Sequence, residues 1–409
     1  MNIAGPVKNS PSIYRAYQHG LDELLRSLPE NKILFRSSRS DHCGCLTLIS
    51  IDLDARYVKD ICISIEESSH LGRLYDIDVI DPSGNKLDRA VERSCIVCGT
   101  PGRGCAAGRL HPIDEIISVT NRVIDEHFCT LDSASIAKIA EKSLILEVET
   151  TPKPGLVDLN NSGSHTDMDV GTFRKSATAL VPYFSKCFEI GAETKKQTAE
   201  ATFLELRAAG LMAEKAMYEA TGGINTHKGV IYSLGVLLGA IGRLWTAGRP
   251  IADISRILTE ASILVQKSPA VDFDIASGAT AGERLFIQRG LTGIRGEVAS
   301  GFSSVVNHSL PIYEAGIADE LSQNDAGVQA LLKLISIIED TNVYHRGGAG
   351  GAQFAKQYAA SLLSSTFDQN AVNQMDDEFI KRNLSPGGAA DLLAITYFLD
   401  MIKREDFIL

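Results

Sequence analysis

The stretch SASIAKIAEKSLILEVE, residues 133–149, decides the fold, because its apolar residues recur at helical rather than strand spacing. Further segments of the same period follow it: residues 199–221, 229–246, 330–340 and 385–403. The last segment begins with Ser385-Pro386, a capping residue followed by proline, which is a common helix start. We therefore predict a large all-α domain over residues 130–409.

The chain before this stretch has a different character. Helices are expected at residues 10–28, where Ser10-Pro11 gives the start, and at residues 111–128. Between them lie short runs of β-type residues, at 46–51, 61–65 and 74–80. Asp81-Pro82-Ser83-Gly84 fits a type I turn. These signals predict a small α/β domain over residues 1–129, which abuts the helical domain near residues 129–132.

Composition excludes several classes of protein. Hydrophobic residues make up 44% of the 409 residues, which is enough for large buried cores and argues against disorder. The formal net charge of −11 and the pI of about 5.4 do not suit a nucleic-acid-binding surface. An acidic enzyme can still bind phosphates when divalent metals bridge its carboxylates to them.

The N-terminal residues, the apolar runs and the cysteines indicate the cellular compartment of the protein. Residues 1–6 have neither the charged region nor the apolar region of a signal peptide. The longest apolar run, residues 229–242, is too short to cross a bilayer and indicates a buried core helix. Eight cysteines at uneven spacings do not resemble a secreted disulfide scaffold. We expect a cytoplasmic protein without membrane contact, whose oligomeric state the sequence leaves open.

A pair of acids in the first domain carries the first chemical signal. Asp76 and Asp78 lie two residues apart in GRLYDIDV, residues 72–79, and would share one face of a strand. Mg²⁺ binds such a pair and can bridge it to a polyphosphate, and Arg73 could reach a phosphate oxygen. The alternative is a solvated strand edge with two surface acids.

Four potential metal ligands follow in a glycine-rich stretch. Cys95, Cys98, Cys105 and His111 match the ligand set of a structural zinc site. Two alternatives stay open: a group of free thiols, or a phosphate-binding loop built on three arginines, Arg93, Arg103 and Arg109.

Clusters of polar residues occur at the expected helix ends of the helical domain. Their chemical members are Glu147, Lys153, Asp158, His165, Asp167, Asp169, Asn225, His227, Lys228, Arg295, Glu297, Asp340, Asn342, Arg346, Ser385 and Asp391. Capping and loop chemistry would explain each cluster alone. Together they would converge if the helices packed with their polar ends at one rim. Acids, cations and histidines are what a metal-dependent polyphosphate site with acid–base groups requires.

The helical domain closely resembles triphosphoribosyl-dephospho-CoA synthase. The strings that carry the resemblance occur in order over residues 130–409: TPKPGLVD (151–158), HTDMD (165–169), NTHKG (225–229), RGE (295–297), EDTN (339–342) and SPGGAAD (385–391). The first domain resembles the apo-citrate lyase phosphoribosyl-dephospho-CoA transferases through AGPVK (4–8), His19-Gly20, residues 72–79 and the cysteine stretch. The chain thus resembles a fused, bifunctional form, with a nucleotidyltransferase-like first domain.

The resemblance implies two reactions. The synthase would join ATP to dephospho-CoA through the 2′-hydroxyl of its ribose and release adenine, keeping the triphosphate on the product. This is glycosyl transfer, which needs a base and stabilisation of positive charge. The transferase would then attach the phosphoribosyl-dephospho-CoA group to a serine of the citrate lyase acyl carrier subunit and release diphosphate.

The resemblance also suggests roles for individual residues. For the synthase, the acids are expected to hold Mg²⁺ and supply the base: Glu147, Asp158, Asp167, Asp169, Glu297 and Asp340. The cations would clamp phosphates, and His165 or His227 would assist departure of adenine. Asn225, Asn342, Ser385 and Asp391 are expected to contact substrate. In the transferase, Asp76 and Asp78 would hold Mg²⁺, and Lys8 and Arg73 would contact phosphates. The Mg²⁺ candidates overall are Asp76, Asp78, Asp167, Asp169 and Asp340.

Two other functions remain open at this stage. A Mg²⁺-dependent hydrolase of a nucleotide or an ADP-ribose-type glycoside could use the same side chains, with water replacing the ribose hydroxyl. A non-enzymatic assembly factor for citrate lyase would bind the carrier without turnover.

Overall fold

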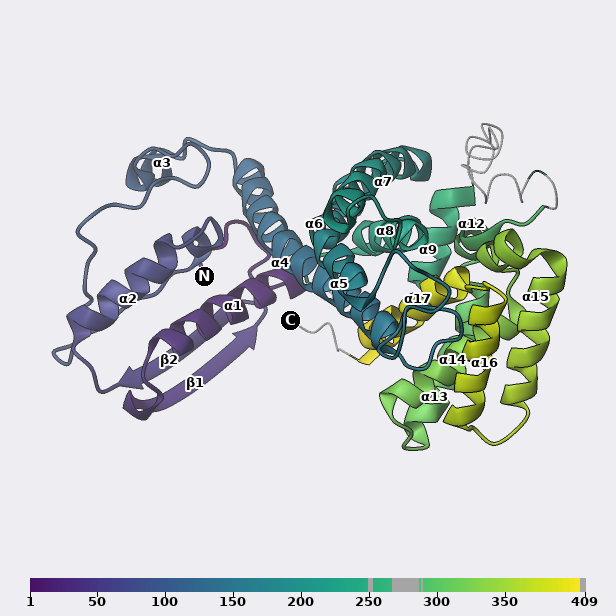
Figure 1. The fold of residues 1–409 in the computed structure, drawn as a ribbon. Coiled ribbons are helices and arrows are strands. Elements are labelled where there is room, and N and C mark those ends of the chain that lie inside the picture. The colour runs from purple at the N-terminus through teal and green to yellow at the C-terminus, as the bar shows by residue number, and fades with distance from the viewer. Residues whose placement is uncertain (249–252, 267–286, 288–289, 405–409) are drawn as a thin grey trace. The chain divides into compact units, whose positions relative to one another are not determined.

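The computed structural model describes residues 1–248, 253–266, 287 and 290–404. Contacts within the chain divide it into two compact units (Figure 1). Unit 1 is built on Met1–Asp132, and unit 2 is built on Ser133–Trp245 and most of the chain that follows. In the described residues, helices dominate and the strands form a single two-stranded sheet in unit 1.

Unit 1 begins with a capped helix and a hairpin. Helix α1 (Pro11–Ser27) starts after Ser10, whose side chain accepts a hydrogen bond from the amide of Ile13, so the predicted start is confirmed. After the short 3-10 helix η1 (Glu30–Lys32), strands β1 (Ile33–Asp41) and β2 (Gly44–Ile51) pair antiparallel. The predicted run 46–51 lies in β2, whereas β1 was not predicted.

The predicted strand at residues 61–65 is wrong. These residues lie in helix α2 (Ala55–Glu67), which Asp54 caps by accepting the amides of Arg56 and Tyr57. Ile61 and Ile65 alternate with smaller residues as a strand would, but they are also four apart, which suits one face of a helix. The N-cap at Asp54 decides between the two periods.

The predicted strand at residues 74–80 is also wrong. Its start belongs to the 3-10 helix η2 (Leu71–Leu74), and the extended residues after it lie outside both strands of the sheet. Side chains satisfy part of its backbone instead: Arg93 donates to the carbonyls of Gly72 and Tyr75, and Glu66 accepts the amide of Ile77. The turn predicted at residues 81–84 is present, with the Gly84 amide bound to the Asp81 carbonyl at 2.9 Å.

A single long helix replaces the two helices predicted around residue 130. After the short helix α3 (Gly102–Gly108), helix α4 runs without a break from Ile113 to Glu149. Residues 129–132 contain neither glycine nor proline to interrupt it. Asp132 is held at this point by Arg15, with a guanidinium nitrogen 2.6 Å from a carboxylate oxygen.

The regular elements in the described residues of unit 2 are all helices, joined by loops. After the C-terminal part of α4 they are α5 (Val170–Ala179), α6 (Val181–Thr194), α7 (Ala199–Thr221), α8 (Lys228–Leu244), α9 (Ile254–Gln266), α12 (Gly293–Ala299), the π-helical turn η3 (Val305–Ser309), α13 (Leu310–Ala318), α14 (Gln323–Ile337), α15 (Thr341–Leu363), α16 (Gln369–Lys381) and α17 (Gly387–Arg404). The predicted helices at 199–221, 229–246 and 385–403 are therefore confirmed within a few residues.

Helices α8 and α17 supply much of the core of unit 2. Residues Val230–Gly242 of α8 are buried almost without interruption, which confirms the predicted core helix. Glycines let α8 approach α6 closely: a methyl group at Gly242 would lie 2.0 Å from the carbonyl oxygen of Phe188. Residues Leu392–Ile402 of α17 are equally buried. These packed helices form a rigid base from which polar helix ends project.

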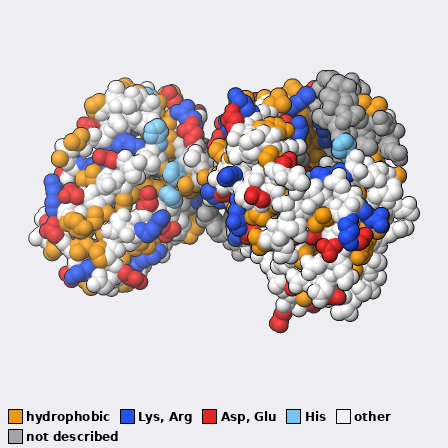
Figure 2. All heavy atoms as spheres, viewed as in Figure 1, with side chains coloured by type: hydrophobic (Ala, Val, Ile, Leu, Met, Phe, Trp, Pro, Cys, Tyr) orange, Lys and Arg blue, Asp and Glu red, His pale blue; other side chains and the backbone are white. Residues whose placement is uncertain are grey.

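The surface view agrees with the composition. Figure 2 shows acidic and basic side chains interspersed over the visible face rather than gathered into one basic surface. In the part of the chain that the structure describes, none of the helices is long and apolar enough to span a membrane.

Candidate active sites

Unit 2 contains a cavity of about 1270 Å³ where helix ends and loops meet. Its lining includes nearly all of the predicted site residues of the helical domain: Glu147, Lys153, His165, Asp167, Asn225, His227, Lys228, Arg295, Glu297, Asp340, Asn342, Arg346, Ser385 and Asp391. Two predicted residues, Asp158 and Asp169, do not line it. The sequence clusters therefore come together around one space.

The loop after α4 brings a buried ion pair to the cavity. Lys153 lies between two prolines and directs its ammonium group to the carboxylate of Glu147. Both side chains are buried. Burial raises the pKa of Glu147, while the positive charge of Lys153 opposes that shift.

The two predicted acids outside the cavity stabilise local structure. Asp158 is buried and accepts the backbone amides of Lys153, Asn160 and Asn161, so it fixes the loop. Asp169 is the N-cap of α5 and forms a capping box with Thr172. In the structure both carboxylates bind backbone amides and lie outside the cavity lining.

His165, in the same loop, forms a hydrogen bond with Arg346 of α15. The Arg346 guanidinium donates to Nδ1 of His165 at 3.3 Å and to the carbonyl of Ser164 at 2.8 Å. An arginine can only donate, so Nδ1 accepts and the ring proton resides on Nε2. Nε2 then donates to the hydroxyl of Ser385 at 2.9 Å. Burial, and secondly the charge of Arg346, lower the pKa of His165.

His227 stands at the start of α8 with its tautomer fixed. The hydroxyl of Thr226 donates to Ser176, which lies 2.7 Å from Nδ1 of His227. The Ser176 proton is thus directed to Nδ1, and the ring proton resides on Nε2. Nε2 is buried and has no hydrogen-bond partner in the described structure. Burial, with a smaller effect of Lys153, lowers the pKa of His227 to about 3, so the ring is neutral.

Three acids line the cavity and influence one another electrostatically: Glu147, Asp340 and Asp391. Asp340 caps α15 through the amides of Asn342 and Val343, and its other oxygen accepts the Ala389 amide at 3.0 Å. Asp391 has no hydrogen-bond or ion-pair partner among the described residues. Burial, followed by the negative charges of Glu147 and Asp340, raises the pKa of Asp391 well above its usual range.

The remaining predicted residues form the rest of the rim. Lys228 pairs with Glu214 at 2.9 Å, and its amide lies 3.3 Å from the Asn225 side chain. The Arg295 guanidinium lies 5.9 Å from the ring centroid of Tyr232. Glu297 accepts hydrogen bonds from the hydroxyl and amide of Ser304. Asp167 is exposed and faces the cavity.

Some contributors to this site were not predicted. Ser176 orients His227 from the middle of α5, and Glu214 pairs with Lys228 from α7. Asp376 of α16 accepts the amide of Gly155 and the side-chain amide of Asn161, both at 2.8 Å. Each acts across a tertiary contact, so no local motif marks it.

The predicted acid pair of unit 1 lies on an irregular extended segment. Asp76 and Asp78 are both exposed, and Lys86 binds Asp78 at 2.7 Å. The predicted phosphate ligands have backbone partners: Lys8 donates to the carbonyl of Ile3, and Arg73 donates to that of Ser94.

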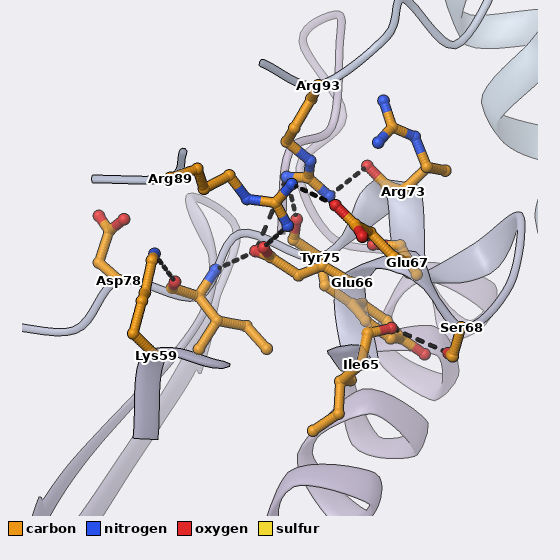
Figure 3. Close-up of polar contacts among 12 residues, drawn as sticks. Lys59, Ile65, Glu66, Glu67, Ser68, Arg73, Tyr75, Asp78, Arg89 and Arg93 are labelled. Atoms are coloured by element: carbon orange, nitrogen blue, oxygen red, sulfur yellow. Dashed lines mark hydrogen bonds and ion pairs between the residues drawn. The ribbon is translucent and has the colours of Figure 1, made fainter. Parts of the chain in front are cut away.

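A buried acid anchors this segment. Glu66 accepts the Ile77 amide at 2.8 Å and pairs with Arg89 at 2.5 Å (Figure 3). Arg93, whose guanidinium lies 3.7 Å from Glu66, reaches the carbonyls of Gly72, Arg73 and Tyr75. Burial lowers the pKa of Arg93, while Glu66 opposes the shift. Glu66 and Arg89 were not predicted, because neither lies within a motif.

The cysteine stretch brings its four predicted ligands together. The sulfur atoms of Cys95, Cys98 and Cys105 and a ring nitrogen of His111 all lie within 4.8 Å of one another. None of the predicted Mg²⁺ ligands belongs to such a preformed group in the described residues.

Comparisons with known proteins agree for both units. The family model described as ATP:dephospho-CoA triphosphoribosyl transferase matches residues 133–407. The model described as apo-citrate lyase phosphoribosyl-dephospho-CoA transferase matches residues 1–127.

Relatives of both architectures are similar to this chain. Protein CitXG of Haemophilus influenzae is 38% identical over 370 residues, covering 85% of this chain and 77% of the relative. Protein CitXG of Leuconostoc mesenteroides is 32% identical and covers 98% of this chain and 90% of the relative. The 2-(5''-triphosphoribosyl)-3'-dephosphocoenzyme-A synthase of Pectobacterium atrosepticum is 40% identical over 69% of this chain and 94% of its own.

The two family matches divide the chain where the structure does, and CitXG relatives extend across both parts. The chain therefore belongs to the family of fused, bifunctional citrate lyase maturation proteins, in which an apo-citrate lyase phosphoribosyl-dephospho-CoA transferase precedes a triphosphoribosyl-dephospho-CoA synthase.

Proposed function

We propose that the cavity of unit 2 is the synthase site and that the Asp76 segment of unit 1 is the transferase site. The chain is a bifunctional transferase. One reaction makes the triphosphoribosyl-dephospho-CoA precursor from ATP and dephospho-CoA, and the other transfers the phosphoribosyl-dephospho-CoA group to a carrier subunit. The observation that carries the synthase assignment is the convergence of fourteen predicted side chains around one cavity.

In the synthase reaction, we assign the base to Asp391. The attacking 2′-hydroxyl must lose a proton as its oxygen bonds to the anomeric carbon and the bond to adenine breaks. The Asp391 carboxylate has no partner to displace in the described structure, and a raised pKa makes it a stronger base than an ordinary carboxylate. Glu147 and Asp340 add negative potential beside an oxocarbenium-like transition state.

His227 suits the departing adenine. His227 lines the cavity with a neutral ring, and its Nε2 N–H is buried with no hydrogen-bond partner in the described structure. A hydrogen bond from Nε2 to a ring nitrogen of adenine would stabilise the charge that develops as the glycosidic bond breaks. The Thr226–Ser176 relay keeps the proton on that nitrogen.

Helix ends and cations suit the triphosphate. Helices α8, α15 and α17 all begin at the cavity, where their dipoles favour an anion. Arg295 and Arg346 add fixed positive charge. Asp167, exposed at the rim, is the candidate that fits Mg²⁺, because this ion is often held by one or two carboxylates together with substrate phosphates. A bound Mg²⁺ would neutralise phosphate charge.

The synthase assignment is tested by adenine release from ATP with Mg²⁺, measured with and without dephospho-CoA. We expect release only with dephospho-CoA, and its loss in Asp167→Ala. Asp169→Asn is the matched control, because asparagine caps helices about as well as aspartate but removes the charge. Release without dephospho-CoA would indicate a hydrolase, and equal loss in both variants would refute the separate roles.

For the transferase, we propose that Asp76 and Asp78 flank the reacting phosphate. The carrier serine oxygen would attack that phosphorus while diphosphate leaves, as in nucleotidyl transfer. Asp76 and Asp78 would hold a Mg²⁺ ion, which would neutralise charge on the leaving diphosphate; in this structure Asp78 pairs with Lys86. The citrate lyase acyl carrier subunit is the proposed acceptor.

Asp76→Asn tests this assignment in the full-length chain. We expect loss of carrier modification, followed by intact-protein mass, with adenine release unchanged. Loss of both activities together would argue against separate sites.

A further inference from the structure

The geometry points to a zinc site in unit 1, formed by Cys95, Cys98, Cys105 and His111. The site lies outside both reaction sites and would hold the loop that braces the transferase segment. Its four ligand atoms are drawn from three local structures: a tight turn, the first turn of α3, and the residue two before α4.

The distances among the ligand atoms suit tetrahedral coordination. The sulfur atoms of Cys98 and Cys105 are 3.4 Å apart, and Nε2 of His111 is 3.3 Å from the Cys98 sulfur. A tetrahedral zinc ion with its usual bond lengths separates two sulfurs by about 3.8 Å, and a sulfur from a nitrogen by about 3.5 Å. A disulfide would need about 2 Å, so these thiols are not bonded to each other.

The backbone around Cys95 and Cys98 forms a turn in which an amide group points at a sulfur atom. Val97 directs its amide to the Cys95 sulfur at 3.4 Å, and the Gly99 amide binds the Cys95 carbonyl at 2.9 Å. Gly99 has a φ of +73°, a conformation that favours glycine and turns the chain back after Cys98. An amide that points at sulfur stabilises a thiolate, which is the form that binds zinc.

The histidine has the outer partner that zinc-bound histidines usually have. Its Nε2 faces the Cys98 sulfur, while its Nδ1 lies 3.4 Å from a carboxylate oxygen of Glu115, in the first turn of α4. A carboxylate on the far nitrogen fixes the tautomer and the ring orientation for metal binding. One other group of potential metal ligands converges in the described residues: Asp41, His42 and Cys43. Its carboxylate is already paired with Arg39, at 2.6 Å.

Zinc at this position would connect to the transferase segment. The carbonyl of Arg93 accepts the Gly102 amide at 2.9 Å, and Ser94 bridges to Pro101, so the loop closes directly beside the ligands. The Arg93 side chain in turn holds the carbonyls of Gly72 and Tyr75, immediately before Asp76. The ion would thus keep Arg93 in place without touching substrate.

Metal analysis of the purified full-length chain tests the site directly. We expect one zinc per chain, falling below about a tenth in Cys98→Ser and Cys105→Ser because each removes a thiolate ligand. Cys43→Ser, an exposed cysteine outside the cluster, is the matched control and keeps its zinc. Glu115→Gln should weaken zinc affinity by about 10- to 100-fold.

Cobalt substitution keeps the test independent of how well the variants fold. The wild-type chain reloaded with Co²⁺ should show thiolate-to-cobalt charge transfer and the intense visible bands of a tetrahedral site. After a chelator has removed zinc and Mg²⁺ has been restored in both assays, carrier modification should stay abolished while adenine release is unchanged. A reduced wild-type chain that neither contains zinc nor gives a tetrahedral cobalt spectrum would overturn the proposal, as would equal zinc content in Cys98→Ser.

Discussion

Gly229→Ala should disable the synthase by displacing a single carboxylate. Gly229 lies in the first turn of α8, and a methyl group built on it would lie 2.0 Å from an oxygen of Asp391. Ordinary contacts begin near 3.4 Å, so the carboxylate must retreat by about 1.4 Å. A misplacement of about 1 Å at a reacting group can cost about 100-fold in rate, or about 2.7 kcal/mol of transition-state stabilisation.

The assay is kcat/KM for adenine release from ATP and dephospho-CoA by the full-length chain. Thermal unfolding should stay close to wild type, because alanine suits a helix better than glycine and offsets the local strain. Gly350→Ala is the matched control: it also lies in a helix of unit 2, but its methyl group would meet no atom within 4 Å.

A double-mutant cycle isolates the cause. In an Asp391→Ala background the clash is absent, so Gly229→Ala should have almost no further effect. Wild-type activity in Gly229→Ala, or independent effects of the two changes, would refute the assignment of Asp391 as the base.

Three further predictions follow from buried charges. Lys153→Met should lower the free energy of unfolding of unit 2 by about 3–5 kcal/mol, because Glu147 is left buried and unpaired; adding Glu147→Gln should recover part of this in urea titrations. Because the pKa of His227 is lowered to about 3, the unfolded chain takes up a proton there between pH 6.5 and about 3, while the folded chain does not. The free energy of unfolding of the wild type should therefore fall, relative to that of His227→Asn, by up to about 1.4 kcal/mol for each pH unit lost in that window. Unfolding titrations at several pH values measure this difference. Glu66→Gln should slow carrier modification by about tenfold or more without changing adenine release, because the Ile77 amide loses a charged acceptor; equal loss of both activities would contradict this role.

The fold was predictable where one signal dominated. Proline after serine marked the start of α1, and the long apolar run marked α8 as a core helix. Prediction failed where two periods fitted the same residues, as at residues 61–65, or where side chains replaced a neighbouring strand, as around Ile77. Arg93 and Glu66 are distant from that segment in sequence, so no local pattern predicts that their side chains take the place of a neighbouring strand.

The site shows the same limit at the level of single acids. Asp158, Asp167 and Asp169 lie within a dozen residues, and their type alone does not separate them. The structure gives two of them backbone amides to satisfy and leaves Asp167 at the rim of the cavity. Which acid remains available for chemistry depends on where helix α5 begins and how the loop closes, and these are tertiary outcomes.

An acidic chain that handles a triphosphate needs its positive potential to be local. With a net charge of −11, long-range attraction of an anionic substrate is not expected. Three helix starts facing one cavity supply fixed partial charges that do not depend on the net charge. Asp340 occupies two of these starts itself, bridging the amides of α15 and α17. It therefore fixes the spacing of the two helices and, by its own charge, helps keep the proton affinity of Asp391 high. Asp340→Asn should keep the α15 cap and lose the contact with the Ala389 amide. It should also lower the pKa of Asp391 and so shift the acidic limb of the pH–rate profile to lower pH; an unmoved limb would show that Asp391 does not set it.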